Sequence, residues 1–472
     1  MIESLIYFSP YLIMLIAILI LMFGEHEEDE HYRCFRFSRI MLLTSFVLAV
    51  IFYNKPPILG FSIGNRYTLI FECMLYSGSL ILLYLSRKWF AAMHRPAYLF
   101  CGSLFITLLF GNLLVASIDL RLSSACAIML MFNNYLMLRY SDVQKESNTR
   151  TRIYFALILG GTFLLLGATL YIWQMCGMTD YEKIRLYLEF EKDDTHTYIT
   201  IIMLILPFLF LLGLAPLHFG QTETLSKTFL PVFTYFMLLP TIAVWGGFIH
   251  LNISVLPPIA AYLQTFYVSI ALLSVGVGAI GACGGQNVYK IFSYFAVYGS
   301  GIILLTLRRF TPNALNSGFV YMFVYLLAIL GICSCLFGLK KKGEYLFMLT
   351  EFEGAAQKRP YITAMMLVFM FSLLGMPPLS GFLGLFSALN YQALHHHFYQ
   401  LIYLLIMMLV VGYAFLQIMR TLYFIEHKTA FDRADSGIYT AIFLNAILML
   451  IIVLKPQFLA ENIYQMLESM FQ

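Results

Sequence analysis

Charged residues are scarce in this chain of 472 residues, of which Asp, Glu, Lys and Arg make up only 11%. Soluble globular proteins carry roughly a quarter charged residues, so this composition cannot cover a water-facing surface. Hydrophobic residues reach 61%, and such a chain needs lipid as the solvent for most of its length. The sequence therefore excludes a soluble globular protein and predicts a polytopic membrane protein.

Features that would place other chemistry in the chain are also missing. The net charge is only +4, so there is no basic surface of the kind that binds nucleic acid. The eight cysteines show neither zinc-site spacing nor a disulfide framework, and we expect small buried hydrophobic residues. Polar stretches reach only about 20 residues, too few for a soluble cofactor domain. We therefore expect no metal and no redox cofactor in this chain.

The N-terminus lacks a targeting signal. Met1 leads straight into an apolar segment, without a basic region or an Arg-rich presequence. Phe and Tyr are abundant, at 43 and 32 residues, which is a bias that AT-rich codons produce. Both features favour a gene in an organelle genome.

Apolar segments long enough to cross a bilayer, about 20 residues each, recur along the chain. We predict about fourteen, near 5–23, 40–54, 67–85, 97–111, 112–138, 153–176, 198–249, 256–281, 291–307, 317–338, 362–376, 377–395, 398–423 and 438–454. Basic residues such as Arg36, Lys88 and Arg139 follow the first, third and fifth segments. The positive-inside rule therefore places the N-terminus on the outer side. The predicted fold class is all-α.

Two of these regions are interrupted by proline and glycine. The first, 198–249, contains a polar interval and four prolines: Pro207, Pro216, Pro231 and Pro240. We interpret it as one broken helix, with two separate spans as the alternative. The second break contains Pro377, Pro378 and Gly381. Unwound backbone at membrane depth is tolerated only where protein buries it or water reaches it, and paired broken helices are typical of repeat-built transporters.

Acidic residues within apolar segments are the first candidate sites, because ionisable groups in a membrane are costly. Asp119 is expected about two turns into the 112–138 segment, where it would carry a proton or balance a buried cation. The alternative places Asp119 and Arg121 at a helix end in the headgroup region. Glu72 is a second acid at membrane depth, and its alternative is an interhelical hydrogen bond from a protonated carboxyl.

The polar interval of the first break supplies three more candidates. His218 follows Pro216, and a histidine at such a place can relay protons near neutral pH or simply bond to freed carbonyls. Glu223 and Lys227 complete this interval. By contrast, we interpret the His395–His397 run as an ordinary span boundary, because adjacent side chains on a helix do not face one another.

A dinucleotide-binding fingerprint is spelled by Gly276, Gly278 and Gly281. No strand precedes it, and it lies inside a continuous apolar segment. We therefore predict close packing of helices at small residues.

Three stretches carry a resemblance to a known family: Gly213-Leu-Ala-Pro-Leu-His218-Phe with Pro231-Val, Gln286-Asn-Val-Tyr-Lys290 through Gly301, and Ser372-Leu-Leu-Gly-Met-Pro-Pro-Leu-Ser-Gly381-Phe-Leu-Gly384. In order and separation they resemble NADH dehydrogenase subunit 2, an antiporter-like subunit in the membrane arm of respiratory complex I. The likeness covers most of the chain from about residue 95 onward. The His-Phe pair after Ala-Pro favours subunit 2 over its sister subunits.

The resemblance implies an antiporter-like fold with two inverted repeats, each containing a broken helix, and a place in a proton-pumping NADH:ubiquinone oxidoreductase. In that family a row of Glu and Lys residues is thought to carry protons. The helix-embedded Glu of the family falls on Asp119, and a Lys at the start of the next span falls near Arg152. The basic residue before the later span is kept as Lys290.

Three positions depart from the family. Its Lys in the first broken helix falls on Thr241, its Lys after Gly384 falls on Leu385, and its His in the later span falls on Gly299. Threonine and leucine do not titrate as a buried lysine can, and an Arg at 152 would stay protonated. These losses leave three readings: a translocation module using Asp119, Glu72 or Glu223 with ordered water, a non-conducting scaffold of the same complex, or a subunit of a multi-subunit cation/proton antiporter.

The resemblance also sets the expected organisation and surroundings. We divide the chain into N-terminal helices (1–96), a first repeat (97–281), a second repeat (282–423), and a last helix with a tail (424–472). Expected partners are the other membrane-arm subunits, including the sister antiporter-like subunits, and lipids such as cardiolipin, but not nucleic acid. FMN, iron–sulfur clusters and quinone are expected in other subunits. The expected location is the mitochondrial inner membrane, or the plasma membrane of a bacterium.

Overall fold

The computed structural model describes residues 7–24, 31–53, 64–93, 95–141, 148–190, 195–308, 310–341, 343–425 and 431–471. Its described part is almost entirely helical, as predicted, apart from one short hairpin. Ten of its helices are long and apolar enough to cross a membrane. Three shorter apolar helices, α2, α9 and α16, occur beside them, and the predicted total of about fourteen crossings stays a prediction.

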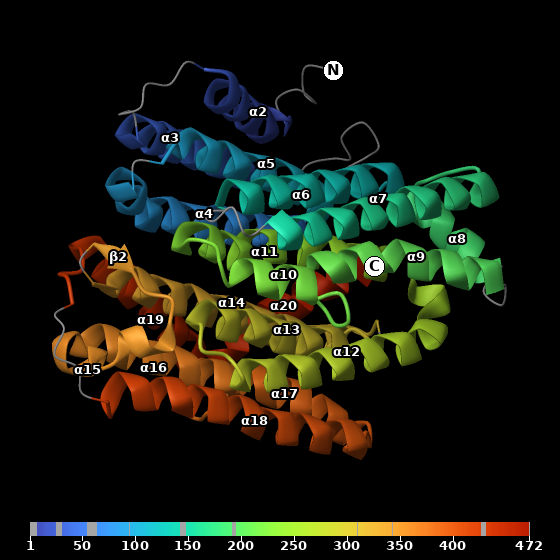
Figure 1. The fold of residues 1–472 in the computed structure, drawn as a ribbon. Helices are drawn as coiled ribbons and strands as arrows, with labels where there is room; N and C mark the ends of the chain where they lie inside the picture. Colours follow the sequence, from blue (N-terminus) through green and yellow to red (C-terminus); the bar gives the residue numbers. More distant parts are fainter. Residues whose placement is uncertain are drawn as a thin grey trace. The chain divides into compact units, whose positions relative to one another are not determined.

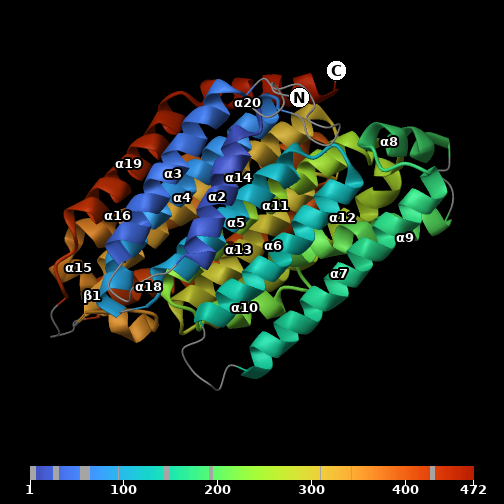
Figure 2. The same ribbon diagram turned by 90° about the horizontal axis from the view of Figure 1, so that it is seen from above.

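The chain divides into two compact units. The first unit consists of Met1–Leu212 and Leu238–Tyr262. Its helices are α2 (Ser9–Phe23), α3 (His31–Ile51), α4 (Arg66–Met93), α5 (Ala97–Ala116), α6 (Leu120–Ser141), α7 (Asn148–Cys176), α8 (Tyr181–Phe190), α9 (Thr195–Leu211), η2 (Pro257–Ile259) and most of α11 (Leu230–Ser254). Within it, α2, α3, α4 and α5 pack side by side (Figures 1 and 2).

The second unit consists of Gly213–Met237 and Leu263–Gln472. It contains α10 (Phe219–Leu225), most of α12 (Ala260–Cys283), α13 (Val288–Thr306), α14 (Pro312–Gly338), β1 (Lys340–Lys341), β2 (Glu344–Tyr345), η3 (Leu349–Phe352), α15 (Ala355–Lys358), α16 (Pro360–Leu374), α17 (Ser380–Leu394), α18 (Phe398–Tyr423), α19 (Ser436–Leu454) and α20 (Pro456–Phe471). Helix α14 lies at its centre, against α13, α16, α17, α19 and α20 (Figure 1). The four segments predicted from the sequence stay a prediction.

The first interruption differs from the one predicted. Helix α9 ends at Leu211, Gly213 takes a left-handed backbone (φ +66°), and turns run to His218 before α10 begins. Residues 230–254 then form a separate continuous helix, α11, so the alternative of two crossings is confirmed. Pro231 was wrongly placed at the break. It is the second residue of α11, where a proline is tolerated because that amide has no helical partner.

The second interruption confirms the predicted break at Pro377 and Pro378, whereas Gly381 is the second residue of the helix that follows. Helix α16 ends in a Schellman motif, in which Gly375 (φ +77°) and Met376 donate to the carbonyls of Ser372 and Phe371. The prolines follow, and α17 restarts at Ser380. The Ser372 hydroxyl accepts from the Gly381 amide at 3.0 Å, so one side chain caps the new helix. A Cβ on Gly381 would lie 1.5 Å from the Ser372 carbonyl oxygen.

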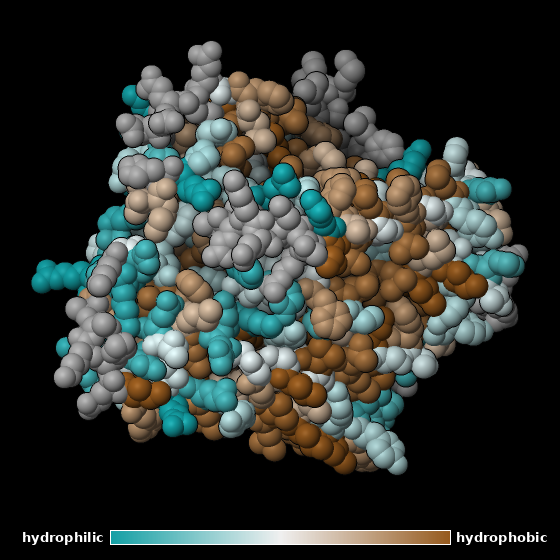
Figure 3. Space-filling model, viewed as in Figure 1, coloured by the Kyte–Doolittle hydropathy of each residue, from teal (hydrophilic) through white to brown (hydrophobic). Residues whose placement is uncertain are grey.

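The glycines of the discarded fingerprint lie at helix contacts in the second unit. A Cβ on Gly278 would approach the backbone nitrogen of Tyr298 to 2.4 Å, and one on Gly281 would meet the Tyr294 ring at 2.2 Å. Close helix packing is therefore confirmed for this stretch. Figure 3 shows brown, apolar areas beside teal, hydrophilic ones on one face of the molecule. Large apolar side chains are exposed on the described helices, such as Phe163 on α7 (73% exposed) and Leu409 on α18 (76% exposed).

The C-terminal segment is a helix, α20, that packs against α14 and α19. Its buried face carries Ile463, Met466 and Leu467, whereas Phe458 and Glu461 are exposed. The amphipathic spacing therefore serves contacts within the second unit.

Candidate functional site

Asp119 was expected inside a membrane span, and that placement is wrong. It lies in the linker between α5 and α6, one residue before α6 begins. The linker pairs with residues ahead of α8: Leu120 donates to the Thr179 carbonyl at 2.9 Å, and Tyr181 donates to the Ile118 carbonyl at 3.0 Å. The helix-end alternative is the one that the geometry supports.

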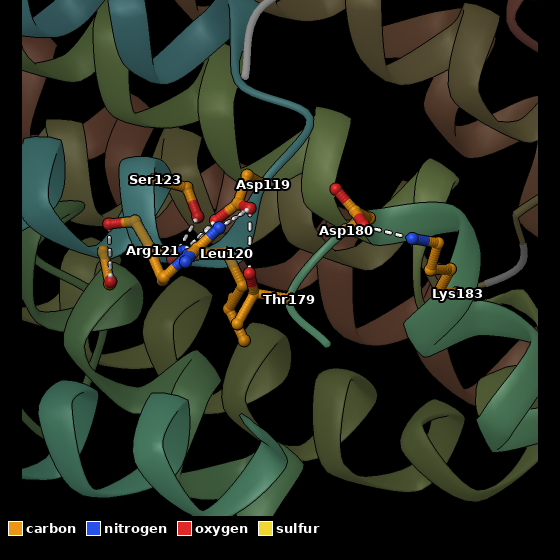
Figure 4. Close-up of polar contacts among 8 residues, drawn as sticks. Asp119, Leu120, Arg121, Ser123, Thr179, Asp180 and Lys183 are labelled. Atoms are coloured by element: carbon orange, nitrogen blue, oxygen red, sulfur yellow. Dashed lines mark hydrogen bonds and ion pairs between the residues drawn. The ribbon is translucent and has the colours of Figure 1, made fainter. Parts of the chain in front are cut away.

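The Asp119 carboxylate is fully occupied (Figure 4). Its Oδ1 accepts from the Arg121 amide (2.7 Å) and Nε (3.2 Å), and its Oδ2 accepts from Arg121 Nη2 (2.9 Å) and Thr179 Oγ1 (2.8 Å). Burial raises the pKa of this carboxyl, but the hydrogen bonds from Arg121 and Thr179 lower it by more, so the net pKa lies below the usual value. A carboxylate held in this way fastens two loops together and stays ionised near neutral pH.

The other first-unit candidates occupy different surroundings. Glu72 lies on α4, 5% exposed, and accepts from the Tyr11 hydroxyl of α2 at 3.2 Å. The bond joins two helices, as the alternative expected, but Tyr11 is the donor and the carboxyl is the acceptor. Arg152 lies in the first turns of α7 with an exposed side chain, so the sequence placed it correctly at a span start.

Three candidates meet in the second unit, around the short helix α10. Glu223 on α10 pairs with Lys290 in the first turn of α13, with Oε1 and Nζ 2.5 Å apart. Both side chains are about one third exposed, at 32% and 33%, so the pair is open to exchange with its surroundings. The Lys290 ammonium lies 6.0 Å from the centre of the Tyr294 ring.

His218 also lies near this tyrosine. Its ring centre is 5.8 Å from that of Tyr294, and the residue is only 1% exposed. Among the described residues neither ring nitrogen has a hydrogen bond of good geometry. Buried polar atoms normally find a partner in protein or ordered water. The imidazole is therefore a buried polar group beside the first break.

Asn287 fixes this cluster, and the sequence analysis did not single it out. Its Oδ1 accepts from the Tyr289 and Lys290 amides at 2.8 and 3.2 Å, while its Nδ2 donates to the Ser226 carbonyl at 2.8 Å. The side chain thus caps α13 and ties its start to the end of α10. Asparagine just before a helical run is a recognisable N-cap signal.

Buried polar residues of α11 were also missed. His250 Nδ1 lies 2.8 Å from the Val115 carbonyl at the end of α5, and since a carbonyl only accepts, this nitrogen carries the proton. Tyr67 donates to the Gly246 carbonyl at 2.6 Å. A histidine inside an apolar span was the available signal.

At two of the positions that depart from the family pattern, apolar or aromatic side chains fill the space. A Cβ on Gly299 would lie 2.6 Å from the Tyr325 ring, so Tyr325 fills the space of a histidine. Leu385 is 4% exposed and packs against Gly375. Thr241 lies in the continuous helix α11, not in a broken one. Neither these losses nor the assigned proton roles are tested by the geometry, and they stay predictions.

No group of three or more His, Cys, Asp or Glu side chains suited to a metal ion occurs within the described ranges. His395 instead places Nδ1 2.9 Å from the Tyr391 carbonyl at the end of α17. Lys227 lies in the turn that directly follows helix α10.

Comparison with protein families matches residues 125–429 to the family described as NADH:quinone oxidoreductase/Mrp antiporter, TM. Among curated relatives, NADH-quinone oxidoreductase subunit N of Parvibaculum lavamentivorans is 26% identical over 61% of this chain and 60% of its own length. The subunit N of Ruthia magnifica is 23% identical over 95% of both chains.

Solved structures share the fold. A chain of respiratory complex I from Thermus thermophilus superposes with a TM-score of 0.79 at 19% identity, covering 96% of this chain and 98% of that one. A chain of the Mrp complex from a Dietzia species reaches 0.84 at 14% identity, covering 100% and 98%. The antiporter-like, all-helical fold expected from the sequence is confirmed.

Proposed function

The chain belongs to the NADH:quinone oxidoreductase/Mrp antiporter membrane family, and from this we propose that it is a membrane-arm subunit of a proton-translocating NADH:quinone oxidoreductase. Both relatives described above are named NADH-quinone oxidoreductase subunit N. The enzyme activity would belong to the whole complex, with FMN, iron–sulfur clusters and quinone bound by other subunits. Sister membrane-arm subunits and lipids would surround this chain.

The proton-handling site that we propose is the α10 cluster, which consists of His218, Glu223, Lys290 and Tyr294. Glu223 and Lys290 hold opposite charges at a partly exposed end of α13, where a proton can be exchanged with water. The Tyr294 ring lies near both Lys290 and His218. The buried imidazole has ring nitrogens that can accept and donate a proton through ordered water. This juxtaposition beside a broken helix is the observation that carries the assignment.

The test uses the assembled complex in proteoliposomes, with protons moved per NADH as the readout. Glu223→Gln and Lys290→Met should lower this yield while NADH oxidation continues. Exposed ion pairs contribute at most about 1 kcal/mol to stability, so unfolding would not explain the loss. Lys183→Met, which breaks an exposed pair with Asp180 (2.9 Å), is the matched control. An unchanged yield in both site variants would leave the chain a scaffold.

A second candidate is a subunit of a multi-subunit cation/proton antiporter. It is supported by the likeness to the Mrp complex, which has the higher TM-score of the two structures. Purification decides between them, since a complex that contains this chain either oxidises NADH or does not. The organelle origin stays a prediction, because the two relatives described above are bacterial.

A further inference from the structure

A narrow cleft, here called the α8 cleft, lies in the first unit. Its walls are formed by the last two turns of α7, by α8, and by the first two turns of α9. Figures 1 and 2 show these three helices close together. The cleft has a volume of about 270 Å³, close to the lower limit of about 300 Å³ for ligand pockets. It therefore has room for part of an alkyl chain.

Apolar side chains dominate the walls of the α8 cleft. They are Ile172 and Met175 on α7, Ile184 and Leu188 on α8, and Ile201 on α9. Thr200 also lines the cleft, but its hydroxyl donates to the His196 carbonyl at 2.8 Å, so this group is satisfied within its own helix. Apolar cavities stay dry and take up apolar molecules. The cleft is therefore suited to hydrocarbon.

Aromatic residues place the cleft at the boundary between hydrocarbon and lipid headgroups. Tyr171 and Tyr187 line it, and Trp173 on the last turns of α7 is 54% exposed. Tryptophan and tyrosine are enriched at membrane–water interfaces. Helix α7 is long and apolar enough to span a membrane, and it ends at Cys176, three residues after Trp173. A lipid bound here would insert its chain between α7 and α9 and keep its headgroup beside α8.

Helix α8 lies in an acidic segment, with six acidic and three basic residues between positions 180 and 194. The bases on α8 are engaged in two ion pairs: Lys183 with Asp180 at 2.9 Å and Arg185 with Glu189 at 3.7 Å. Glu182 is exposed and has no ion pair among the described residues. Such a rim repels an anionic headgroup. A primary ammonium group, by contrast, donates charge-assisted hydrogen bonds to carboxylates.

We propose that the α8 cleft binds one acyl chain of a zwitterionic phospholipid of the phosphatidylethanolamine type, with the ammonium group of the lipid against the acidic rim of α8. The apolar walls supply affinity for the chain, and the rim selects the headgroup. Anionic lipids such as phosphatidylglycerol and cardiolipin are disfavoured at this site. The inference requires that α7 lies in a membrane, but it does not depend on the proposed redox role.

Photolabelling of the assembled complex in phosphatidylcholine nanodiscs tests the proposal. The probes are phosphatidylethanolamine and phosphatidylglycerol with the same diazirine on the same acyl chain, added in equal amounts, and peptide mass spectrometry locates the adducts. The ethanolamine probe should label the cleft walls about three to five times more than the glycerol probe, which is the factor expected for one exposed charge contact. Equal labelling by the two probes, or walls without adducts, would overturn the proposal.

A variant that narrows the cleft tests whether the chain lies inside it. Cys176 lines the cleft and is half-buried, so Cys176→Phe should reduce the ethanolamine adducts on the walls to the background level of the exposed α7 face. Met178→Phe is the matched control, because Met178 is 48% exposed and lies outside the cleft lining. It should keep wild-type labelling. Equal labelling in the two variants contradicts binding inside the cleft.

A charge reversal on the rim leaves the walls untouched, so it decides even if Cys176→Phe does not assemble. Glu182 and Glu189 are both exposed, and the double variant Glu182→Lys with Glu189→Lys should reverse the preference in favour of the glycerol probe. Glu461→Lys with Glu468→Lys is the matched control, since it makes the same charge change at the same seven-residue spacing on the exposed face of α20. An unchanged preference in the α8 variant contradicts the proposal.

Discussion

At the scale of single residues, Asp119 shows that an acid in a largely apolar stretch can hold two loops together. The sequence placed it within a span because most residues from 112 to 138 are apolar. The chain instead turns at residues 117–119, where the Ser117 hydroxyl bonds to the Leu114 carbonyl. Its partner Thr179 is 60 residues away in the chain, and no local pattern reveals such a pairing.

Asp119→Asn should destabilise the protein by about 1–3 kcal/mol, since a charged acceptor of several hydrogen bonds becomes a neutral amide. Thermal unfolding of the purified complex measures the loss. Asp180→Asn is the matched control, because it removes only an exposed pair with Lys183 and should cost less than about 0.5 kcal/mol. Equal melting temperatures for both variants would contradict the proposal that Asp119 joins the two loops. A lower proton yield in Asp119→Asn alone would support a role of Asp119 in proton transport.

The lowered pKa of Asp119 also predicts a pH dependence. Its folded pKa lies below the unfolded value of about 3.9. The stabilisation is therefore complete above that unfolded pKa and is lost as the pH falls through the folded one. Unfolding curves between about pH 6 and pH 3 should show a smaller loss of stability in Asp119→Asn than in the wild type. Parallel curves would show that the carboxylate contributes nothing to the acid limit.

At the scale of helices, proline and glycine spacing predicted both interruptions but only one boundary correctly. The second break was complete in the sequence because Gly375, Pro377, Pro378 and Gly381 stand within seven residues. The first interrupted helix was predicted to be too long. Apolar residues resume at Leu230 immediately after the turn, so the start of a new helix cannot be seen in the hydropathy pattern. A hydropathy pattern cannot separate one broken span from two when the connecting turn is short.

Gly381→Ala tests whether the second break depends on close backbone approach. The added methyl would overlap the Ser372 carbonyl oxygen, so the expected cost exceeds about 3 kcal/mol and the complex should assemble poorly. Gly160→Ala on α7, where nothing lies within 4 Å of the new Cβ, should be neutral or stabilising by up to about 1 kcal/mol. Comparable yields of both complexes in membranes would contradict the packing described for α17.

At the scale of the whole molecule, composition predicted most of the fold. Apolar run length predicted the ten long apolar helices, and breaker residues predicted the two interruptions. The site was less predictable. His218, Glu223 and Lys290 were each named as candidates, but their meeting depends on α10 packing against α13, a tertiary contact. Asn287 and Tyr294, which position the cluster, carry no chemistry of their own that would draw attention in a sequence.

The three tryptophans report which faces meet lipid. Trp173 on α7 is 54% exposed, whereas Trp89 is 5% and Trp245 is 0% exposed. Brominated acyl chains should therefore quench the fluorescence of the reconstituted chain mainly through Trp173. Trp173→Phe should abolish most of this quenching, and Trp245→Phe should not. Quenching that persists in Trp173→Phe would mean that the outer face of α7 is covered.

The double role of Asn287 has a mechanical consequence. Its side-chain nitrogen donates to the carbonyl that follows α10, and its side-chain oxygen accepts from two amides in the first turn of α13. A displacement of either helix is transmitted through this side chain, and it changes the distance between Glu223 and Lys290. Strain arriving from a neighbouring subunit could thus be converted into the release or capture of a hydrogen ion.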